Sequence, residues 1–600
     1  MKDRLAPPWT AICLPLLLFF FFSVPSAAFE LSLRIDPATP DLKRSLANAS
    51  LVLTAKREGV TNPQDILAAA QADYGRLVSA LYEHGYYGPV VSILVDGREA
   101  SAIPPLSRLT GVSRVDVIVS TGPLFRLGTA EIAPLAAATM LPMTFRVGLP
   151  AETSVIRDAA LAGVDGWRAV GHAKAQIDRQ DVTADHQQAR LDVRLGIAPG
   201  PRVRFGDLNI SGDSVVRDER IRRIAGISSG KVFDLVVLER AAARLRRAGT
   251  FSSVTLREAD KLGPGDTMDI ELALIDAKPR RYGFGAELQS AEGVTLSGFW
   301  MHRNLLGGAE RLRIEGEVSG LGGETNGLDY HLRVGLTRPS TFNTDTDLHI
   351  LGEIEQLDEP HYFSRQGSVE LGFNRYFSET LTAVAGVAYR YSDVQDDLGS
   401  RQFSHLALPL AATWDRRDDL LNPTQGTYLR AEAMPFVGLG TSASGGRGYL
   451  DGRVYRSFGA EDGVVVAGRL QFGTVFGSSI AATPPDLLFL SGGSGTVRGH
   501  SYQSLSVVSG PVETGGRSFL GIAGEVRLRV TDKIGAVAFY DAGYVGANSW
   551  LDDTGGWHSG AGLGIRYQTG IGPIRLDVAT PVTGPDTGGV QVYLGIGQAF

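Results

Sequence analysis

The chain is almost free of cysteine. Of its 600 residues only Cys13 is a cysteine, and it lies close to the N-terminus. The rest of the chain therefore cannot be held together by disulfides or by thiolate metal sites. Histidine is also scarce, and the 10 His residues show no metal-binding spacing. We expect neither a metal ion nor another cofactor.

Long apolar segments are missing after residue 28. No later stretch reaches about 18 consecutive apolar residues, which excludes a protein that spans the membrane with helices. Basic tracts are missing as well, and the net charge is -7. The sequence therefore gives no sign of a nucleic-acid partner. A soluble periplasmic protein and a membrane β-barrel both remain open at this point.

Motifs of enzymes are absent too. The sequence contains no G-x-S-x-G elbow, no H-E-x-x-H helix and no Walker loop. Gly493 and Gly495 are most simply loop glycines, and the carboxylates of Asp552 and Asp553 are most simply solvated. We predict that the protein is not an enzyme.

The N-terminus has the pattern of a secretory signal peptide. Lys2 and Arg4 precede an almost unbroken apolar run, Ile12–Val24, and Ser26-Ala27-Ala28 supplies small residues for cleavage. We predict cleavage after Ala28. The alternative, a retained membrane anchor, requires a longer apolar span.

Residues 29–277 mix helical and strand patterns, and the order β-α-α-β-β recurs three times. The third copy is the clearest. It predicts a strand, two helices and two strands over Arg204–Ile210, Asp218–Ile224, Asp234–Arg247, Phe251–Glu258 and Met268–Leu274.

The two earlier copies follow the same order. In the first copy the elements are expected at Leu31–Ile35, Leu42–Leu53, Pro63–Glu83, Val90–Val95 and Val115–Ser120. The middle copy runs from Leu124 to Leu195, with one helix expected at Ala151–Ala162 and a second at Gly166–His172. Small sheets leave strand edges unpaired, so we expect an edge such as Val254–Arg257 to accept an extended segment of another chain.

From about residue 281 onward the helical pattern disappears and charged residues alternate with apolar ones. In one such segment Glu525, Arg527 and Arg529 alternate with Val526, Leu528 and Val530. Because successive strand side chains point to opposite faces, one face is charged and the other apolar. A soluble sandwich alternates too, but here no helical segment remains to cover a sheet. The pattern therefore predicts a transmembrane barrel of about sixteen strands with a polar lumen.

Three Gly-rich segments of this region are expected to be long loops at the outer end of the barrel. They are Asp393–Arg401, Gly477–Gly515 and Gly546–His558. A longer turn at the opposite end is expected between Trp414 and Gly426.

Three features of the C-terminal half together resemble one known family. Gly492–His500 (GGSGTVRGH) lies in the longest loop, Phe539–Gly543 (FYDAG) follows it, and the chain ends on Phe600. This combination is similar to the Omp85 family of outer-membrane assembly and secretion barrels. The three β-α-α-β-β copies resemble the POTRA domains of that family.

The resemblance implies an α+β series of periplasmic POTRA-like repeats followed by a 16-stranded antiparallel transmembrane β-barrel. The implied boundaries are 1–28 for the signal peptide, 29–122, 123–200 and 201–277 for the three POTRA-like domains, and 278–600 for the barrel.

The resemblance also implies a lock between the long loop and the lumen. In the family this loop folds back into the barrel, and its Arg bonds to acidic residues on the next two strands. The matching loop residues here are Val497, Arg498 and Gly499, and the matching carboxylates are Glu525 and Asp541. Strand alternation supports the assignment of Glu525, because this residue lies on the charged face of its strand. His500 replaces the usual aromatic residue.

Glycines gather at both ends of the predicted barrel. Gly283 and Gly285 lie in the first strand, and Gly595 and Gly597 lie in the last, Val590–Phe600. Because glycine contributes little packing, we expect a weak seam between these strands, one that could open. The alternative is that the glycines only relieve crowding where the barrel closes.

The last residues resemble the C-terminal signal by which outer-membrane barrels are recognised for insertion. Gly595 and the terminal Phe600 carry this resemblance, and Gln598 departs from it. Strand alternation places Gln598 and Phe600 on the face of Val592 and Leu594.

Within the family, three POTRA-like units on a sixteen-strand barrel are similar to the TamA branch. This implies a factor in the outer membrane of a Gram-negative bacterium that helps insert a subset of outer-membrane proteins, such as autotransporters. The implied partners are an inner-membrane-anchored TamB-like protein, unfolded outer-membrane protein clients and outer-membrane lipid. A two-partner-secretion transporter and a general BamA-like barrel-assembly protein remain alternatives. A passive porin would not need periplasmic domains.

Overall fold

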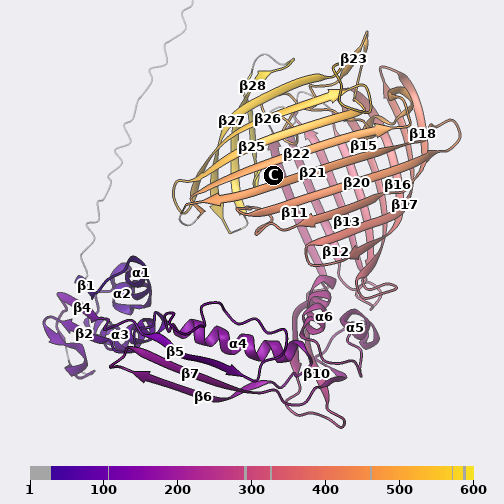
Figure 1. Ribbon diagram of the computed structural model, residues 1–600. Coiled ribbons are helices and arrows are strands. Elements are labelled where there is room, and N and C mark those ends of the chain that lie inside the picture. Colours follow the sequence, from indigo (N-terminus) through magenta and orange to yellow (C-terminus); the bar gives the residue numbers. More distant parts are fainter. Residues whose placement is uncertain are drawn as a thin grey trace, which may run out of the picture. The chain divides into compact units, whose positions relative to one another are not determined.

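The computed structural model describes residues 29–600 except 106, 108, 290–292, 324–326, 460–461, 571 and 586–588. The predicted signal peptide lies outside the described residues. The chain divides into two compact units (Figure 1): one runs through Val203 and includes Val232–Leu235, and the other holds Arg204–Lys231 and Val236–Phe600. None of the described helices is long and apolar enough to cross a membrane.

The first domain has a four-stranded sheet in the order β1-β4-β2-β3. Its elements are β1 (Glu30–Asp36), α1 (Pro40–Ala49), α2 (Leu51–Arg57), α3 (Pro63–Glu83), β2 (Val90–Val95), β3 (Arg98–Glu99) and β4 (Arg114–Ser120). Leu46, Ile66, Leu77, Val115 and Val117 lie in the core between the helices and the sheet.

The single helix predicted over Leu42–Leu53 is wrong, because the chain starts a new helix after Ser50. The Ser50 hydroxyl donates to Asp73 Oδ2 at 2.6 Å, and Asp73 also accepts the N–H groups of Leu51 and Val52. A buried carboxylate thus caps the N-terminus of α2, where anions are stabilised. Asp73 is 23 residues away from Ser50, so local periodicity does not reveal this break.

The middle domain has a three-stranded sheet in the order β5-β7-β6. Its elements are β5 (Arg126–Ala133), α4 (Thr153–Ala169), β6 (Gln176–Asp185) and β7 (Arg190–Ala198). The prediction of two helices is wrong: residues 134–152 contain none, and α4 is one continuous helix.

Gly163 and Gly166 lie inside α4, at points where other elements pack closely against it. A Cβ at Gly163 would lie 2.7 Å from Ile197 Cδ1, and one at Gly166 would lie 2.0 Å from Thr139 Oγ1. These glycines therefore allow β7 and the preceding loop to approach the helix closely. Gly163, which lies in the gap between the two predicted helices, is a packing residue inside α4.

The third domain has the predicted β-α-α-β-β order. Its elements are β8 (Arg204–Ser211), α5 (Asp218–Ala225), α6 (Leu235–Ala248), β9 (Phe251–Glu258) and β10 (Thr267–Asp276). The sheet order is β8-β10-β9, with β8 parallel and β9 antiparallel to β10. β9 therefore forms one edge of the sheet.

The remainder of the chain forms a closed antiparallel barrel, which confirms the predicted sixteen-strand fold (Figure 1). Its strands are β11 (Arg280–Gln289), β12 (Gly293–His302), β13 (Arg311–Leu321), β14 (Asp329–Arg338), β15 (Thr346–Glu359), β16 (Tyr362–Tyr376), β17 (Leu381–Asp396), β18 (Gly399–Ala407), β19 (Leu410–Asp415), β20 (Gly426–Gly438), β21 (Gly445–Phe458), β22 (Val464–Phe476), β25 (Ser518–Arg529), β26 (Ile534–Gly546), β27 (Gly556–Thr569), β28 (Gly572–Thr583) and β29 (Gln591–Ile596).

β18 and β19 are two halves of the eighth strand. Both pair with β17 on one side and with β20 on the other. The break falls at Leu408-Pro409, because proline has no N–H to donate to the sheet. The predicted loop Asp393–Arg401 is wrong, since β17 and β18 are joined by only Asp397 and Leu398.

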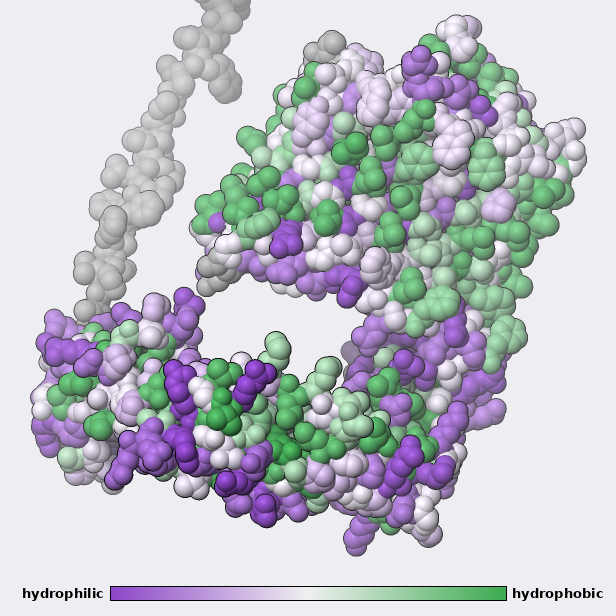
Figure 2. Space-filling view, in the orientation of Figure 1, coloured by the Kyte–Doolittle hydropathy of each residue, from purple (hydrophilic) through white to green (hydrophobic). Residues whose placement is uncertain are grey.

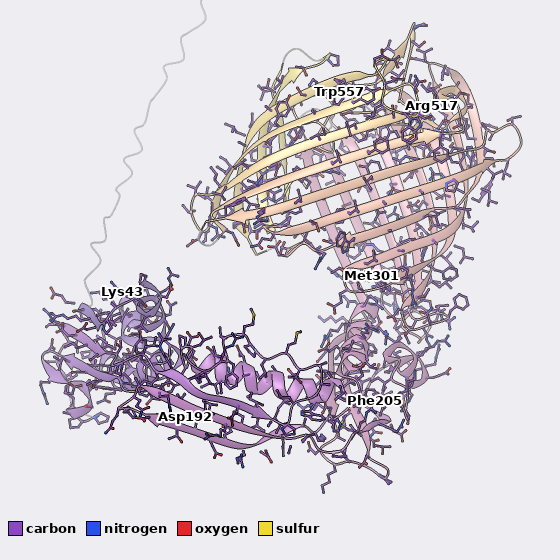
Figure 3. All side chains as sticks on the ribbon, viewed as in Figure 1. Lys43, Asp192, Phe205, Met301, Arg517 and Trp557 are labelled. Carbon is purple, nitrogen blue, oxygen red and sulfur yellow. The ribbon has the colours of Figure 1, made fainter. Side chains whose placement is uncertain are left out.

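The barrel wall follows the predicted alternation. Outward residues such as Phe284, Ile354 and Leu563 are exposed, and apolar colour is prominent on the visible wall (Figure 2). We call the end where β11 begins the inner end and the opposite one the outer end. Figure 3 labels a residue near each: Met301, late in β12, lies towards the inner end, and Arg517, just before β25, lies at the outer end.

Candidate functional site: a luminal lock and a barrel seam

The long connection between β22 and β25 enters the barrel. Its first part leads to Gly492–His500, and a short hairpin follows, formed by β23 (Val507–Ser509) and β24 (Val512–Thr514). Arg517 fixes the base of this loop by donating to the carbonyls of Ser478 and Ala547. Arg498 is only 2% exposed, so the tip is enclosed by protein.

Arg498 contacts both predicted carboxylates. Its Nε donates to Asp541 Oδ2 at 2.7 Å and its Nη2 to Asp541 Oδ1 at 2.9 Å, which is a bidentate pair. Nη1 donates to Glu525 Oε1 at 2.7 Å. The guanidinium carbon lies 3.6 Å from the centre of the Phe539 ring. The loop arginine is thus held by charge, by geometry and by an aromatic face.

A third carboxylate, Asp577 on β28, completes the cluster. It lies 3.4 Å from Arg498 Nη1 and also accepts hydrogen bonds from Arg566. Glu525 in turn accepts from Arg527 Nε at 2.9 Å. Three carboxylates therefore face three guanidinium groups in the buried lumen.

Asp577, Arg527 and Arg566 carry no motif that assigns them a role from the sequence alone. Strand alternation marks Asp577 as luminal. However, only the resemblance suggested partners for Arg498, and it points to the two strands that follow the loop.

The neighbours of Arg498 fix the backbone of the loop tip. Gly499 has a φ of +99°, and a Cβ there would lie 2.6 Å from the Thr580 carbonyl oxygen. Its N–H donates to the Tyr593 hydroxyl at 3.0 Å. Val497 is fully buried. His500 Nε2 lies 2.9 Å from the Ser559 carbonyl oxygen.

The last four residues leave the sheet, so the prediction of one strand from Val590 to Phe600 is wrong. β29 ends at Ile596, and Gly597, with a φ of +92°, turns the chain into the lumen. Gln598 and Phe600 therefore do not share the outward face of Val592 and Leu594.

Luminal contacts hold this tail in place. Phe600 packs with Tyr455, Ala467 and Ala523, and its main-chain oxygen accepts a hydrogen bond from Arg527 Nη2 at 3.0 Å. Gln598 Oε1 accepts from Arg566 Nε at 2.7 Å. These two arginines also bind the carboxylates around Arg498, so the loop tip and the C-terminal tail belong to one polar network.

The seam between β11 and β29 is short. Only Leu288 pairs with Leu594 and Gln289 with Tyr593, whereas β11 and β12 pair along the whole run from Arg280 to Gln289. Both seam rungs lie at the outer end of β11. The part of β11 nearer the inner end has no strand partner on its β29 side among the described residues.

The predicted seam glycines occupy different environments. A Cβ at Gly283 would lie 2.2 Å from Phe299 Cε1, and one at Gly285 would lie 2.6 Å from Ser297 Oγ. Both therefore make room for side chains of β12, which pairs with β11 on the side away from the seam. Gly595 lies in β29, and Gly597 lies in the turn after it.

Arginines of the third domain fasten it to the inner end of the barrel. Arg244 makes a bidentate pair with Asp345, at 2.7 and 2.8 Å. The hydrogen bonds from Arg244 lower the pKa of Asp345, which lies in the turn between β14 and β15. Arg220 is 4% exposed and donates to the carbonyls of Gly308 and Pro339.

In the described part of the chain, no group of three or more His, Cys, Asp or Glu residues could hold a metal ion.

Two family models match the chain. The model described as the Omp85 superfamily domain matches residues 304–600. The POTRA model, described as a surface antigen variable number repeat, matches residues 203–272.

Two curated proteins are similar in sequence. Outer envelope protein 80, chloroplastic, of Arabidopsis thaliana is 23% identical over 558 residues, which cover 84% of this chain and 69% of that protein. The outer membrane protein assembly factor BamA of Neisseria meningitidis serogroup B is 24% identical over 137 residues, 23% of this chain and 17% of that protein.

Solved structures share the fold. BamA from Haemophilus ducreyi lacking POTRA domains 1–3 gives a TM-score of 0.60 at 16% identity and covers 78% of this chain and 99% of that one. CdiB from Acinetobacter baumannii gives 0.51 at 14% identity, with 79% and 90% covered.

Proposed function

Because the chain is built from an Omp85 superfamily domain and a POTRA repeat, we propose that it is an assembly factor that inserts or translocates outer-membrane proteins. The barrel lies in the outer membrane, and the POTRA repeat lies in the periplasm. The observation that carries the proposal is the seam: two backbone rungs join β11 to β29, and the tail after β29 is turned into the lumen.

This seam suits the delivery of a strand into the membrane. The inner part of β11 offers backbone N–H and C=O groups that β29 does not pair. Such an edge can accept an extended strand, as in other cases of β-augmentation. A client strand could add to β11 at small cost, because few native rungs must be broken first.

The POTRA-like domains would receive the client before it reaches the barrel. β9 forms an open edge of the third domain, and Val254–Arg257 lies along it. Proline at alternate positions of this segment would remove backbone donors from the edge. We expect such a variant to lose client binding; retained binding would show that the edge is not the site.

We further propose the TamA-like role within this class. It includes the assembly of a subset of clients such as autotransporters, an inner-membrane-anchored TamB-like partner and contact with outer-membrane lipid. It is supported by the three small α+β domains that precede the barrel, and we assign 29–122 and 123–200 as POTRA-like domains alongside 201–277.

A disulfide across the seam tests the proposal. Leu288→Cys with Leu594→Cys would join two residues that are directly paired. A matched control joins β12 to β13 through Leu296→Cys and Val318→Cys, which are also paired. We expect oxidation to stop client assembly only in the seam variant. Equal activity of both oxidised variants would overturn the proposed opening of the seam.

Deletion of the gene in its own host separates the alternatives. Viable cells that lack a few barrel proteins would support the specialised role. Inviability with a general loss of barrels would favour a BamA-like role, and the loss of a single exoprotein would favour two-partner secretion.

A further inference from the structure

An ion pair spans the seam at the point where its backbone pairing ends. Arg575 lies on β28, and its Nη2 is 3.6 Å from Oε1 of Glu287 on β11. β29 runs between these two strands, so the side chains meet across it. This contact joins the first strand to the second-last one.

Gly595 leaves the space for this contact. It is paired in register with Arg575 on β28. A Cβ at Gly595 would lie 3.3 Å from Arg575 Nε and 3.7 Å from Glu287 Oε1. A side chain longer than a methyl group would therefore stand between the two charges, whereas glycine lets them approach.

The position along the strands is also specific. The seam rungs are Gln289 with Tyr593 and Leu288 with Leu594. One step further towards the inner end, the same register brings Glu287 opposite Gly595. The ion pair thus lies directly beyond the last backbone rung of the seam. Gly595, which it crosses, lies two residues before the turn at Gly597.

Two carboxylates, Asp577 and Glu287, act on the charge of Arg575. Its side chain is 11% exposed, and the nearby carboxylate of Asp577 already accepts hydrogen bonds from Arg566 and Arg498. Among the described residues, Glu287 is the carboxylate within ion-pair distance of Arg575. Separating β11 from β28 would leave the largely buried guanidinium of Arg575 beside Arg566, with Asp577 shared among Arg575, Arg566 and Arg498, and this favours closure.

We propose that Arg575 and Glu287 form a clasp that positions the two strands of the seam and must part before the seam opens from the inner end. This inference rests on the proposed function, which requires the seam to open. Arg575 and Glu287 are positioning residues: they hold the edge of β11 and do not themselves carry a client.

Disulfide trapping measures the clasp without reference to client assembly. The Leu288→Cys, Leu594→Cys variant is oxidised briefly in isolated outer membranes, and the cross-linked fraction is followed with time. Because Cys13 is the sole native cysteine, no other cysteine of the described chain competes. We expect Glu287→Gln or Arg575→Gln to lower the rate of cross-linking by about two- to fivefold, the range for a partly exposed ion pair.

Charge exchange distinguishes a clasp from a folding effect. The double variant Glu287→Arg, Arg575→Glu keeps an ion pair with reversed polarity, and we expect it to recover most of the lost rate. Glu315→Gln is the matched control, because it breaks an ion pair with Arg313 inside one strand. The rate in this control should equal that of the parent.

An unchanged rate in both single variants, or no recovery in the exchanged variant, would overturn the clasp. Either result would leave the proposed function standing, since that is tested by client assembly in the locked barrel. Conversely, a normal clasp in a protein whose locked seam remains active would refute the proposed opening of the seam, and the clasp would then serve only to hold the barrel closed.

Discussion

The backbone N–H of Gly499 donates to the hydroxyl of Tyr593 at 3.0 Å. Gly499 belongs to the loop that enters the barrel from its outer end, and Tyr593 is one of the two residues of β29 that pair with β11. The loop tip therefore touches the last strand at the seam itself. Contacts of the loop should influence how firmly the barrel closes.

Replacing Arg498 should destabilise the barrel. Arg498→Ala leaves Asp541 and Glu525 buried with one cation fewer, at a cost of about 3–5 kcal/mol. Arg498→Lys should be intermediate, because an ammonium cannot reproduce the bidentate pair. The midpoint temperature of barrel unfolding can be followed by gel mobility without prior boiling. It should be highest for the native chain, lower for Arg498→Lys and lowest for Arg498→Ala. A fully stable and active Ala variant would contradict the luminal lock.

Two glycines of the same loop should respond differently to alanine. Gly499→Ala forces a Cβ against the Thr580 carbonyl at a positive φ, which should cost at least about 1–2 kcal/mol. Gly495→Ala is the control, because a Cβ there meets nothing within 4 Å. Thermal unfolding of the two variants measures the difference. Equal loss in both would mean that the loop tip is not held as described.

Phe600 should stabilise the folded barrel, in addition to any role that it has in insertion. Phe600→Ala removes the ring from its contacts with Tyr455 and Ala523, a loss of about 3 kcal/mol for a buried aromatic. Phe600→Leu should retain most of the stability. Both variants are purified after refolding in detergent, so that insertion in the cell does not affect the result. Unchanged unfolding of the Ala variant would place the tail outside the lumen.

Docking of the third domain should weaken in acid. Because Arg244 holds the pKa of Asp345 below its usual range, this pair contributes fully above about pH 4 and is lost as the pH falls through the lower folded-state pKa. The protection factors of α6 amides in detergent-solubilised protein, which are corrected for the intrinsic exchange rate at each pH, should therefore fall below about pH 4.

Asp345→Asn should show faster exchange already at neutral pH and little further change in acid. Asp260→Asn, an exposed carboxylate in the same domain, should match the native chain. If the Asp345→Asn variant lost protection in acid as the native chain does, the Arg244–Asp345 pair would not be the cause of the pH dependence.

Periodicity predicted most of the architecture because the barrel and the third domain depend on local patterns. Charged residues on alternate positions identified the luminal face that includes Glu525, whereas Asp541 was suggested by the resemblance. The long Gly-rich loop was predicted from composition. These signals come from neighbours in sequence, and the structure preserves them.

The structure differs from the predictions where contacts between residues far apart in sequence determine the local conformation. Asp73 divides a predicted helix because it caps α2 from another helix. Thr139 packs against Gly166, inside a helix that was predicted as two. The inward turn of the tail depends on Arg527 and Arg566, which lie on two other strands. Alternation alone would carry the last strand straight on to Phe600.

The junction of the third domain with the barrel relies heavily on main-chain acceptors. Arg217 donates to the Leu306 carbonyl, Arg220 to those of Gly308 and Pro339, and Thr250 to that of Arg303. Every residue type carries a carbonyl, so the barrel turns can change their side chains without losing these acceptors. Substitutions in the turns at positions other than Asp345 should therefore be tolerated, whereas Arg217 and Arg220, which bind the main chain of the turns, should not be free to vary.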